Sequence, residues 1–106
     1  MIDIKVLQEY YNQDKIIISA HALERCRRRG IKQKDIRNCI FSGEIIEQYP
    51  EDFPFQSCLI YGYAIDGRIL HVVASDEGTA SRIITAYIPN TDKFEEDLKT
   101  RREQKE

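Results

Sequence analysis

The stretch that decides the fold is Cys58-Leu59-Ile60-Tyr61-Gly62-Tyr63-Ala64-Ile65-Asp66-Gly67-Arg68-Ile69-Leu70-His71-Val72-Val73-Ala74-Ser75, in which two apolar segments flank an Asp-Gly pair. This pattern predicts a β-hairpin, because glycine accepts the positive φ that a tight turn requires. A two-residue turn pairs Ile65 with Arg68 and places Gly62 opposite His71, where the glycine leaves space for the imidazole. Both faces of this hairpin are apolar, so we expect both to be largely covered.

The predicted register assigns each side chain to one face of the hairpin. One face then holds Tyr61, Tyr63, Leu70 and Val72, and the other holds Ile60, Ala64, Ile69, His71 and Val73. Further strands are predicted at residues 44–49 and 81–88, and residues 15–18 form a short strand or an extended link. The predicted helices span residues 3–13, 20–29, 33–42 and 92–98, and the last of them frays into a solvated tail. We therefore predict a single α+β domain over residues 1–106, with helices packed on a four-stranded antiparallel sheet.

The predicted second helix carries most of the basic charge. Ser19 suits the N-cap and Gly30 the left-handed position after the C-cap, and residues 19–42 should form a helical hairpin. At about 100° per residue, His21, Arg25 and Arg28 share one side with Arg29 beside them, while Ala20, Leu23, Cys26 and the Arg27 stem lie opposite. We expect the basic side to face outward and to bind anions. The alternatives are a solvated helix face and a Glu24–Arg28 ion pair.

Charge is unevenly distributed along the chain. The chain has 16 Lys and Arg against 18 Asp and Glu, for a formal net charge of −2. This balance argues against a general nucleic-acid binder. Residues 25–37 nevertheless contain only one acidic side chain, Asp35, among seven basic ones, and an acidic stretch follows at residues 44–52. One end of the molecule can therefore attract phosphate.

The cysteines and the hydropathy pattern exclude several classes of protein. Cys26, Cys39 and Cys58 are odd in number and form no CxxC pair, so we expect reduced, partly buried thiols in place of a disulfide framework or a zinc site. No apolar run approaches the roughly 20 residues of a membrane span, and the N-terminus lacks a signal-peptide layout. We expect a cytoplasmic protein with no membrane contact, no metal and no cofactor.

The remaining polar residues suit metal-free RNA cleavage. That reaction needs a base for the 2′-hydroxyl, an acid for the leaving oxygen, and cations for the charge on the phosphate. The catalytic candidates are His21, His71 and Tyr87, and the substrate-binding candidates are Arg25, Arg28 and Arg29. Each has a structural alternative: His21 as a surface side chain, His71 as a satisfied core histidine, and Tyr87 as a half-buried aromatic residue.

Several short motifs resemble a widespread family of small bacterial proteins of uncharacterised function. They are Ser19-Ala20-His21-Ala22, Glu24-Arg25, Arg29-Gly30-Ile31, Gly43-Glu44-Ile45-Ile46-Glu47-Gln48-Tyr49-Pro50, Gly67-Arg68, Leu70-His71-Val72-Val73 and Ile83-Ile84-Thr85-Ala86-Tyr87. The resemblance covers about residues 16–102. Two positions depart from the pattern: Arg28 stands where an acidic residue is expected, and Phe94 where a tryptophan is.

That family distantly resembles the RelE, MqsR and BrnT toxins. The resemblance implies a RelE-like core over about residues 16–98, a charged C-terminal helix or tail at 92–106, and metal-independent cleavage of RNA. It also implies a cognate antitoxin, in some pairs a YgiT-type zinc-finger protein, and RNA or the ribosome as a partner. Two alternatives stay open, namely a non-catalytic RNA- or ribosome-binding module and a protein-interaction domain whose basic helix docks an acidic partner.

Overall fold

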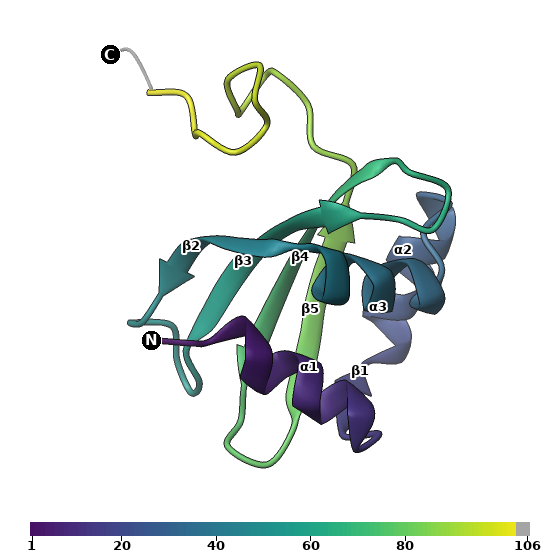
Figure 1. Cartoon of the computed structure of the whole chain (residues 1–106), viewed down its shortest axis with the longest axis vertical. Coiled ribbons are helices and arrows are strands. Elements are labelled where there is room, and N and C mark those ends of the chain that lie inside the picture. The colour runs from purple at the N-terminus through teal and green to yellow at the C-terminus, as the bar shows by residue number, and fades with distance from the viewer. Residues whose placement is uncertain (104–106) are drawn as a thin grey trace.

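A computed structural model describes residues 1–103, and within this range the chain forms three helices and one five-stranded mixed sheet (Figure 1). The elements are α1 (Ile4–Asn12), β1 (Ile16–Ile18), α2 (Ala20–Arg28), α3 (Gln33–Ser42), β2 (Glu44–Tyr49), β3 (Ser57–Tyr63), β4 (Ile69–Asp76) and β5 (Ser81–Tyr87). The α+β class is confirmed.

The prediction of four antiparallel strands is wrong in one respect, because β1 joins the sheet as a fifth strand. The strand order is β1-β5-β4-β3-β2, and β1 runs parallel to β5 with Ile16 opposite Ser81 and Ile18 opposite Ile83. The other three pairings are antiparallel. The isoleucine run indicated a strand, but its partner lies more than sixty residues further along the chain, which local patterns do not reveal.

The central hairpin forms, but its predicted register is wrong by one residue. Tyr63 pairs with Ile69, and His71 pairs with Tyr61 instead of Gly62. The loop has three residues: the Gly67 N–H donates to the Ala64 carbonyl oxygen at 3.0 Å and the Ala64 N–H donates to the Arg68 carbonyl oxygen at 2.8 Å. Gly67 takes φ +91°, as expected for a turn that ends in a left-handed bulge residue.

This shift regroups the side chains, because strand residues alternate between faces. Leu70 and Val72 join Ile60 on the helix-covered face, while His71 joins Tyr61 on the opposite face. Gly62 does not make room for His71. It makes room for α3, since a Cβ atom at Gly62 would lie 2.4 Å from the Cys39 carbonyl oxygen.

The helices begin and end close to the predicted positions. Ser19 caps α2 by accepting a hydrogen bond from the Ala22 N–H at 3.1 Å. The helix closes with Gly30 at φ +71° and with the Ile31 N–H donating to the Cys26 carbonyl oxygen at 2.9 Å. The Gly30 N–H also donates to the Arg27 carbonyl oxygen, which completes a Schellman motif.

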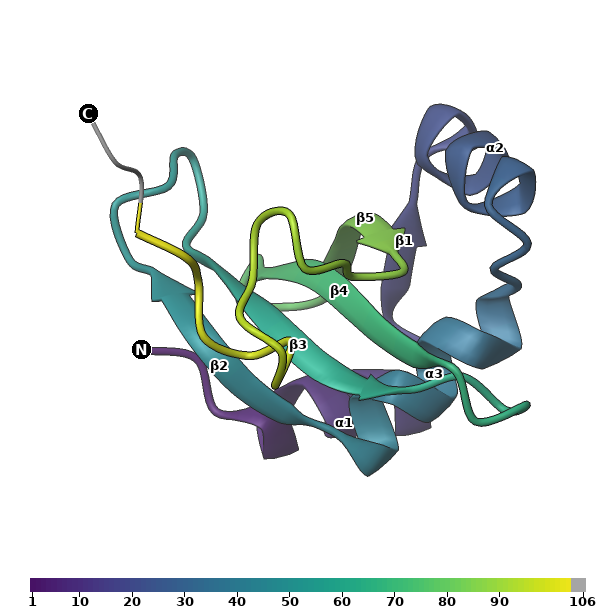
Figure 2. The ribbon, with the colours of Figure 1, turned by 90° about the horizontal axis from the view of Figure 1, so that it is seen from above.

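The predicted helical hairpin is wrong, because α2 and α3 pack on different parts of the sheet. Figure 2 shows α1 and α3 beneath the sheet and α2 beyond its β1 edge. Helix α3 packs on β3 and β4, whereas α2 packs on β5. The core between helices and sheet includes Leu7, Cys26, Ile36, Cys39, Ile40, Cys58, Ile60, Leu70, Val72 and Ile83.

Residues 89–103, which we call the C-terminal strap, cross the opposite face of the sheet (Figure 2). The predicted C-terminal helix is wrong, since the described residues of this segment contain turns and a single bridge between Phe94 and Arg101. Phe94 is 2% exposed and packs on the His71 ring, with centroids 4.6 Å apart. Leu98 takes φ +58°, which no helix residue adopts. The strap thus provides the cover that we expected for the second face.

All three cysteines are free and buried, which confirms the reduced thiols and places them deeper than expected. Among the helices of the described chain, none combines the length and the apolar character that crossing a bilayer demands.

Candidate functional site

A groove of about 520 Å³ lies between α2, the C-terminal half of β5 and the strap. Its lining residues are Arg25, Arg29, Tyr49, Val73, Thr85, Tyr87, Ile88, Pro89, Asn90, Lys93, Phe94 and Arg101. Among these described residues four are cationic and none is a carboxylate. Because the groove walls concentrate positive charge, the groove favours an anionic ligand although the chain as a whole is acidic.

Helix α2 directs two arginines into this groove. Ala22 and Cys26 are the buried residues of α2, so Arg25 and Arg29, which follow at helical spacing, turn toward β5. Arg29 Nη1 donates to the Ala86 carbonyl oxygen at 2.8 Å and to Thr85 Oγ1 at 3.2 Å. The Arg29 side chain is thereby anchored, and Arg25 beside it forms no ion pair among residues 1–103.

The predicted packed side of α2 is only partly right: Cys26 is buried as expected, but Ala22 is buried in place of Ala20 and the Arg27 stem, because the helix is rotated relative to our expectation. The Arg27 side chain is 76% exposed, and Ala20 is exposed too. Arg27 pairs with Glu24 at 2.8 Å, and Arg28 pairs with the same carboxylate at 3.3 Å, which confirms the predicted Glu24–Arg28 pair. These two arginines therefore lie outside the groove.

Tyr87 lines the floor of the site, and His71 lies directly behind it. They are paired residues on β4 and β5, and His71 Nδ1 lies 3.2 Å from the Tyr87 hydroxyl oxygen. The second ring nitrogen, Nε2, lies 2.7 Å from the Leu98 carbonyl oxygen. A carbonyl oxygen can only accept, so Nε2 carries the proton and Nδ1 accepts the Tyr87 O–H.

Burial shifts the pKa values of both His71 and Tyr87. It lowers the pKa of His71 below its ordinary value, because the desolvated imidazolium is disfavoured, and this outweighs the opposing effect of the Leu98 carbonyl. Burial also raises the pKa of Tyr87. Both shifts favour the neutral forms, so a neutral imidazole accepts a hydrogen bond from a neutral phenol that borders the groove.

A charged pair supports this floor from β2. Arg101 donates to both carboxylate oxygens of Glu47, at 3.0 and 3.2 Å, and the Tyr49 hydroxyl donates to the same carboxylate. Burial alone would raise the pKa of Glu47, but the hydrogen bonds from Arg101 and Tyr49 outweigh it and hold the pKa low. The pair ties the strap to the sheet and keeps the Glu47 carboxylate ionised.

The fold gathers four of the six predicted site residues. Arg25, Arg29 and Tyr87 line the groove, and His71 lies directly behind Tyr87 with no exposed surface. His71 is therefore a satisfied core histidine that reaches the groove only through Tyr87. His21 and Arg28 are exposed on α2 and do not line the groove.

The sequence analysis missed the strap's contribution, chiefly Lys93, Phe94 and Arg101. We expected residues 92–98 to form a helix that frays into a solvated tail. Two observations could have located it: Phe94 is a lone aromatic residue in a polar segment, and the second face of the hairpin needed a cover.

These features define an α+β domain with a basic groove between a helix and the edge of a sheet. The sequence profile of the domain of unknown function DUF4258 matches residues 18–88, and the chain belongs to this family. The matched range contains Arg25, Arg29, His71 and Tyr87, whereas the strap follows it. Comparisons with curated proteins and with solved structures give no significant match.

Proposed function

We propose that this protein is a RelE-like, metal-independent ribonuclease that binds RNA in the basic groove. The observation that carries the proposal is the meeting of Arg25, Arg29 and Lys93 with Tyr87, whose hydroxyl donates to a neutral His71. Guanidinium groups suit phosphate, because their planar N–H donors match its oxygens.

The chemistry runs through Tyr87. The 2′-hydroxyl proton passes to the phenolic oxygen as the phenol gives its own proton to His71 Nδ1, so that the phenol stays neutral. The 2′-oxygen attacks phosphorus, the bond to the 5′-oxygen breaks, and water in the open groove protonates that oxygen. The hydroxide that this leaves takes up the proton held by His71 through the Tyr87 hydroxyl, which restores the neutral imidazole. Arg25 and Arg29 stabilise the charge that develops on the phosphate. The products are a 2′,3′-cyclic phosphate and a free 5′-hydroxyl.

A second candidate function is RNA binding without cleavage. It is favoured by the complete burial of His71, whose two ring nitrogens are both engaged. In this alternative the Tyr87–His71 pair only holds the strap in place, and the groove retains RNA through its cations. Such binding weakens steeply as salt rises.

Cleavage of a labelled RNA in excess EDTA separates these candidates. The ribonuclease proposal expects cleavage that persists without divalent metal and leaves cyclic phosphate or 3′-phosphate ends. Tyr87→Phe protein purified in parallel is the control, since a contaminating nuclease would be equally active in both preparations. Salt-sensitive retention without cleavage would select the second candidate, and a strict magnesium requirement would refute the proposed chemistry.

As a toxin, the protein would act on cytoplasmic RNA and would be restrained by a cognate antitoxin. An acidic antitoxin segment would compete with RNA for the groove cations. Induced expression in a bacterium should then slow growth, and Tyr87→Phe should relieve the effect. Equal growth inhibition by folded Tyr87→Phe and by the original protein would remove Tyr87 from the toxic activity.

A further inference from the structure

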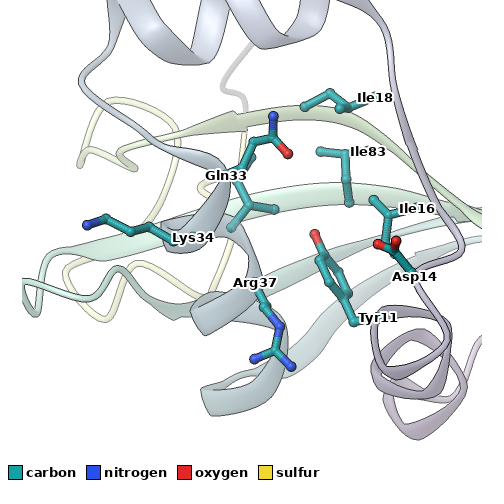
Figure 3. Close-up of a pocket in the computed structure, with 9 residues that line it drawn as sticks. Tyr11, Asp14, Ile16, Ile18, Gln33, Lys34, Arg37 and Ile83 are labelled. Atoms are coloured by element: carbon teal, nitrogen blue, oxygen red, sulfur yellow. The ribbon is translucent and has the colours of Figure 1, made fainter.

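A hollow of about 280 Å³ on the helix-covered side of the sheet differs from the basic groove in what faces its interior. Its floor is made of isoleucines, and Figure 3 shows that Lys34 and Arg37 direct their charged ends away from it. The basic groove instead brings Arg25 and Arg29 beside Tyr87. A nucleotide whose phosphate needs cations therefore fits the basic groove, and its base has to be recognised by residues that line that groove.

Asn90 lines the basic groove three residues after Tyr87, just beyond the end of β5. Three residues separate two Cα atoms by at most roughly 11 Å, so a phosphate at Tyr87 and a base at Asn90 are close enough to belong to one dinucleotide. Ile88, which lies between them in the chain, is 42% exposed, and Pro89 also lines the groove. These two side chains give a base an apolar surface to pack on beside Asn90.

The side-chain amide of Asn90 is held in one orientation. The Asp92 N–H donates to Asn90 Oδ1 at 3.0 Å. A backbone N–H can only donate, so the amide atom that faces it has to be the oxygen, and the nitrogen Nδ2 lies on the other branch of the amide. Nδ2 has no hydrogen-bond partner within the part of the chain that the structure describes. Asn90 thus offers two N–H donors that the described protein does not use.

Asn90 differs in this respect from the other uncharged polar side chains of the groove, which have protein partners. These pairs are Tyr49 with Glu47, Tyr87 with His71, and Thr85 with Arg29. Asn90 is therefore the side chain with the most hydrogen-bonding capacity left for the edge of a base.

Two donors on one nitrogen match one base better than the other three. On the edge remote from its sugar, guanine carries two neighbouring acceptors, O6 and N7. Adenine has an amino donor in place of O6, cytosine presents an amino donor at N4, and uracil presents the single acceptor O4. Unpaired bases of RNA expose these edges to side chains. Guanine is the base that can satisfy both donors of Asn90.

We propose that Asn90 recognises a guanine beside the scissile phosphate, so that the protein cleaves RNA next to guanine in preference to other bases. This inference rests on the proposed function, because it requires RNA in the basic groove. Asn90 Nδ2 donates to guanine O6 and N7, Ile88 packs against the ring, and the groove cations hold the phosphate. The Asp92 N–H has a positioning role, since it fixes which end of the amide meets the base.

The test uses short oligouridine RNAs that carry one variable base, incubated with the protein in excess EDTA. We expect cleavage at one fixed phosphate beside guanine, roughly tenfold faster than at the same position beside adenine. Base analogues separate the two contacts. Inosine keeps O6 and N7 and should match guanine, whereas 2-aminopurine lacks O6, 7-deazaguanine lacks N7, and both should be cleaved more slowly.

Asn90→Asp is the decisive variant. Aspartate keeps an oxygen for the Asp92 N–H but replaces the two donors with an acceptor, so the preference should shift from guanine to adenine, whose amino group can donate. Lys93→Gln is the matched control, because it makes the same change of one charge unit in the groove. It should slow cleavage of all the RNAs alike and leave the ratio of guanine to adenine unchanged.

The outcomes separate this inference from the proposed function. Equal cleavage beside guanine and adenine, or a guanine preference that Asn90→Asp leaves unchanged, would overturn the role of Asn90 while the ribonuclease proposal stands. If the RNAs are retained without cleavage, the same ratios are expected in the dissociation constants. Neither cleavage nor retention of any of these RNAs would overturn both proposals.

Discussion

His71 Nδ1 lies 3.2 Å from the Tyr87 hydroxyl across two neighbouring strands, while His71 Nε2 donates to the Leu98 carbonyl oxygen of the strap at 2.7 Å. One imidazole therefore connects the floor of the basic groove to the segment that covers the sheet. Because the strap carbonyl selects the tautomer, the strap makes Nδ1 the acceptor for Tyr87. The proposed activity and the stability of the domain thus depend on one residue.

Tyr87→Phe removes the hydroxyl while keeping the ring. If the groove is catalytic, we expect the RNA cleavage rate to fall about 100-fold or more, because a positioned acid–base group contributes on the order of 10²–10⁴. RNA affinity should change little, since the cations are untouched. Tyr63→Phe, at the exposed end of β3, is the matched control. Equal loss in both variants would contradict the role of Tyr87.

Arg25→Lys and Arg27→Lys compare two arginines of the same helix. Arg25 lines the groove, whereas Arg27 is solvent-exposed and paired with Glu24. Arg25→Lys should reduce cleavage or RNA affinity roughly tenfold, because lysine cannot make a bidentate phosphate contact, and should change stability by less than about 0.5 kcal/mol. Arg27→Lys should leave both nearly unchanged. Both variants are measured at the same low salt concentration, because salt screens the charges. Similar effects of the two substitutions would mean that the basic side of α2 is only a solvated surface and does not contact RNA.

His71 should make stability depend on pH. Its pKa in the folded state lies below the ordinary value of 6.5, so the unfolded chain takes up the proton first as pH falls. The stability that neutral His71 contributes is fully present above about pH 6.5 and is lost progressively below it, toward the folded pKa. Urea unfolding between about pH 7.5 and pH 5 measures this slope. In folded His71→Phe protein the slope should shrink, and an unchanged slope would assign it to other groups.

Phe94→Ala tests whether the strap is part of the folded domain. Phe94 is 2% exposed against the His71 ring, so its loss should lower the free energy of unfolding by about 3 kcal/mol, within the range for a buried phenylalanine. Phe53→Ala is the matched control, because Phe53 is 94% exposed and should change stability by less than about 0.5 kcal/mol. Urea denaturation gives both values, and similar losses would mean that the strap contributes no stability of its own.

Local chemistry made the helices and strands predictable. The bounds of α3 match the prediction, and α2 begins after Ser19 and closes with Gly30 as its caps indicated. Gly43 follows α3 with a φ of −105°, outside the left-handed conformation that Gly30 adopts after α2. Glycine is needed there for a different reason, since a Cβ atom would lie 2.5 Å from the Tyr61 carbonyl oxygen. The sequence shows a glycine at the end of α3, but only the packing of α3 against β3 shows why a glycine is needed there.

The candidate site was partly predictable for the same reason. Arginines one turn apart on a capped helix have to share a side, so Arg25 and Arg29 were identified together. The sequence did not show which way that side faces, because this depends on which α2 residues pack against β5. We expected Ala20 and Leu23 to be packed together with Cys26, but the buried residues of α2 are Ala22 and Cys26. Lys93 and Arg101 were missed because a polar segment gives no periodic pattern.

By itself, the sequence determined the α+β class, the caps of α2, the positions of the four antiparallel strands and the free thiols. Only the tertiary structure decided the partner of β1, the hairpin register, the rotation of α2 and the path of the strap. The physical reason is the range of the interactions. Caps, turns and apolar periodicity act within a few residues, whereas register and pairing depend on how separate segments share one core. A single bulge residue at Gly67 moved His71 to the strap side of the sheet, where it meets both Tyr87 and Leu98.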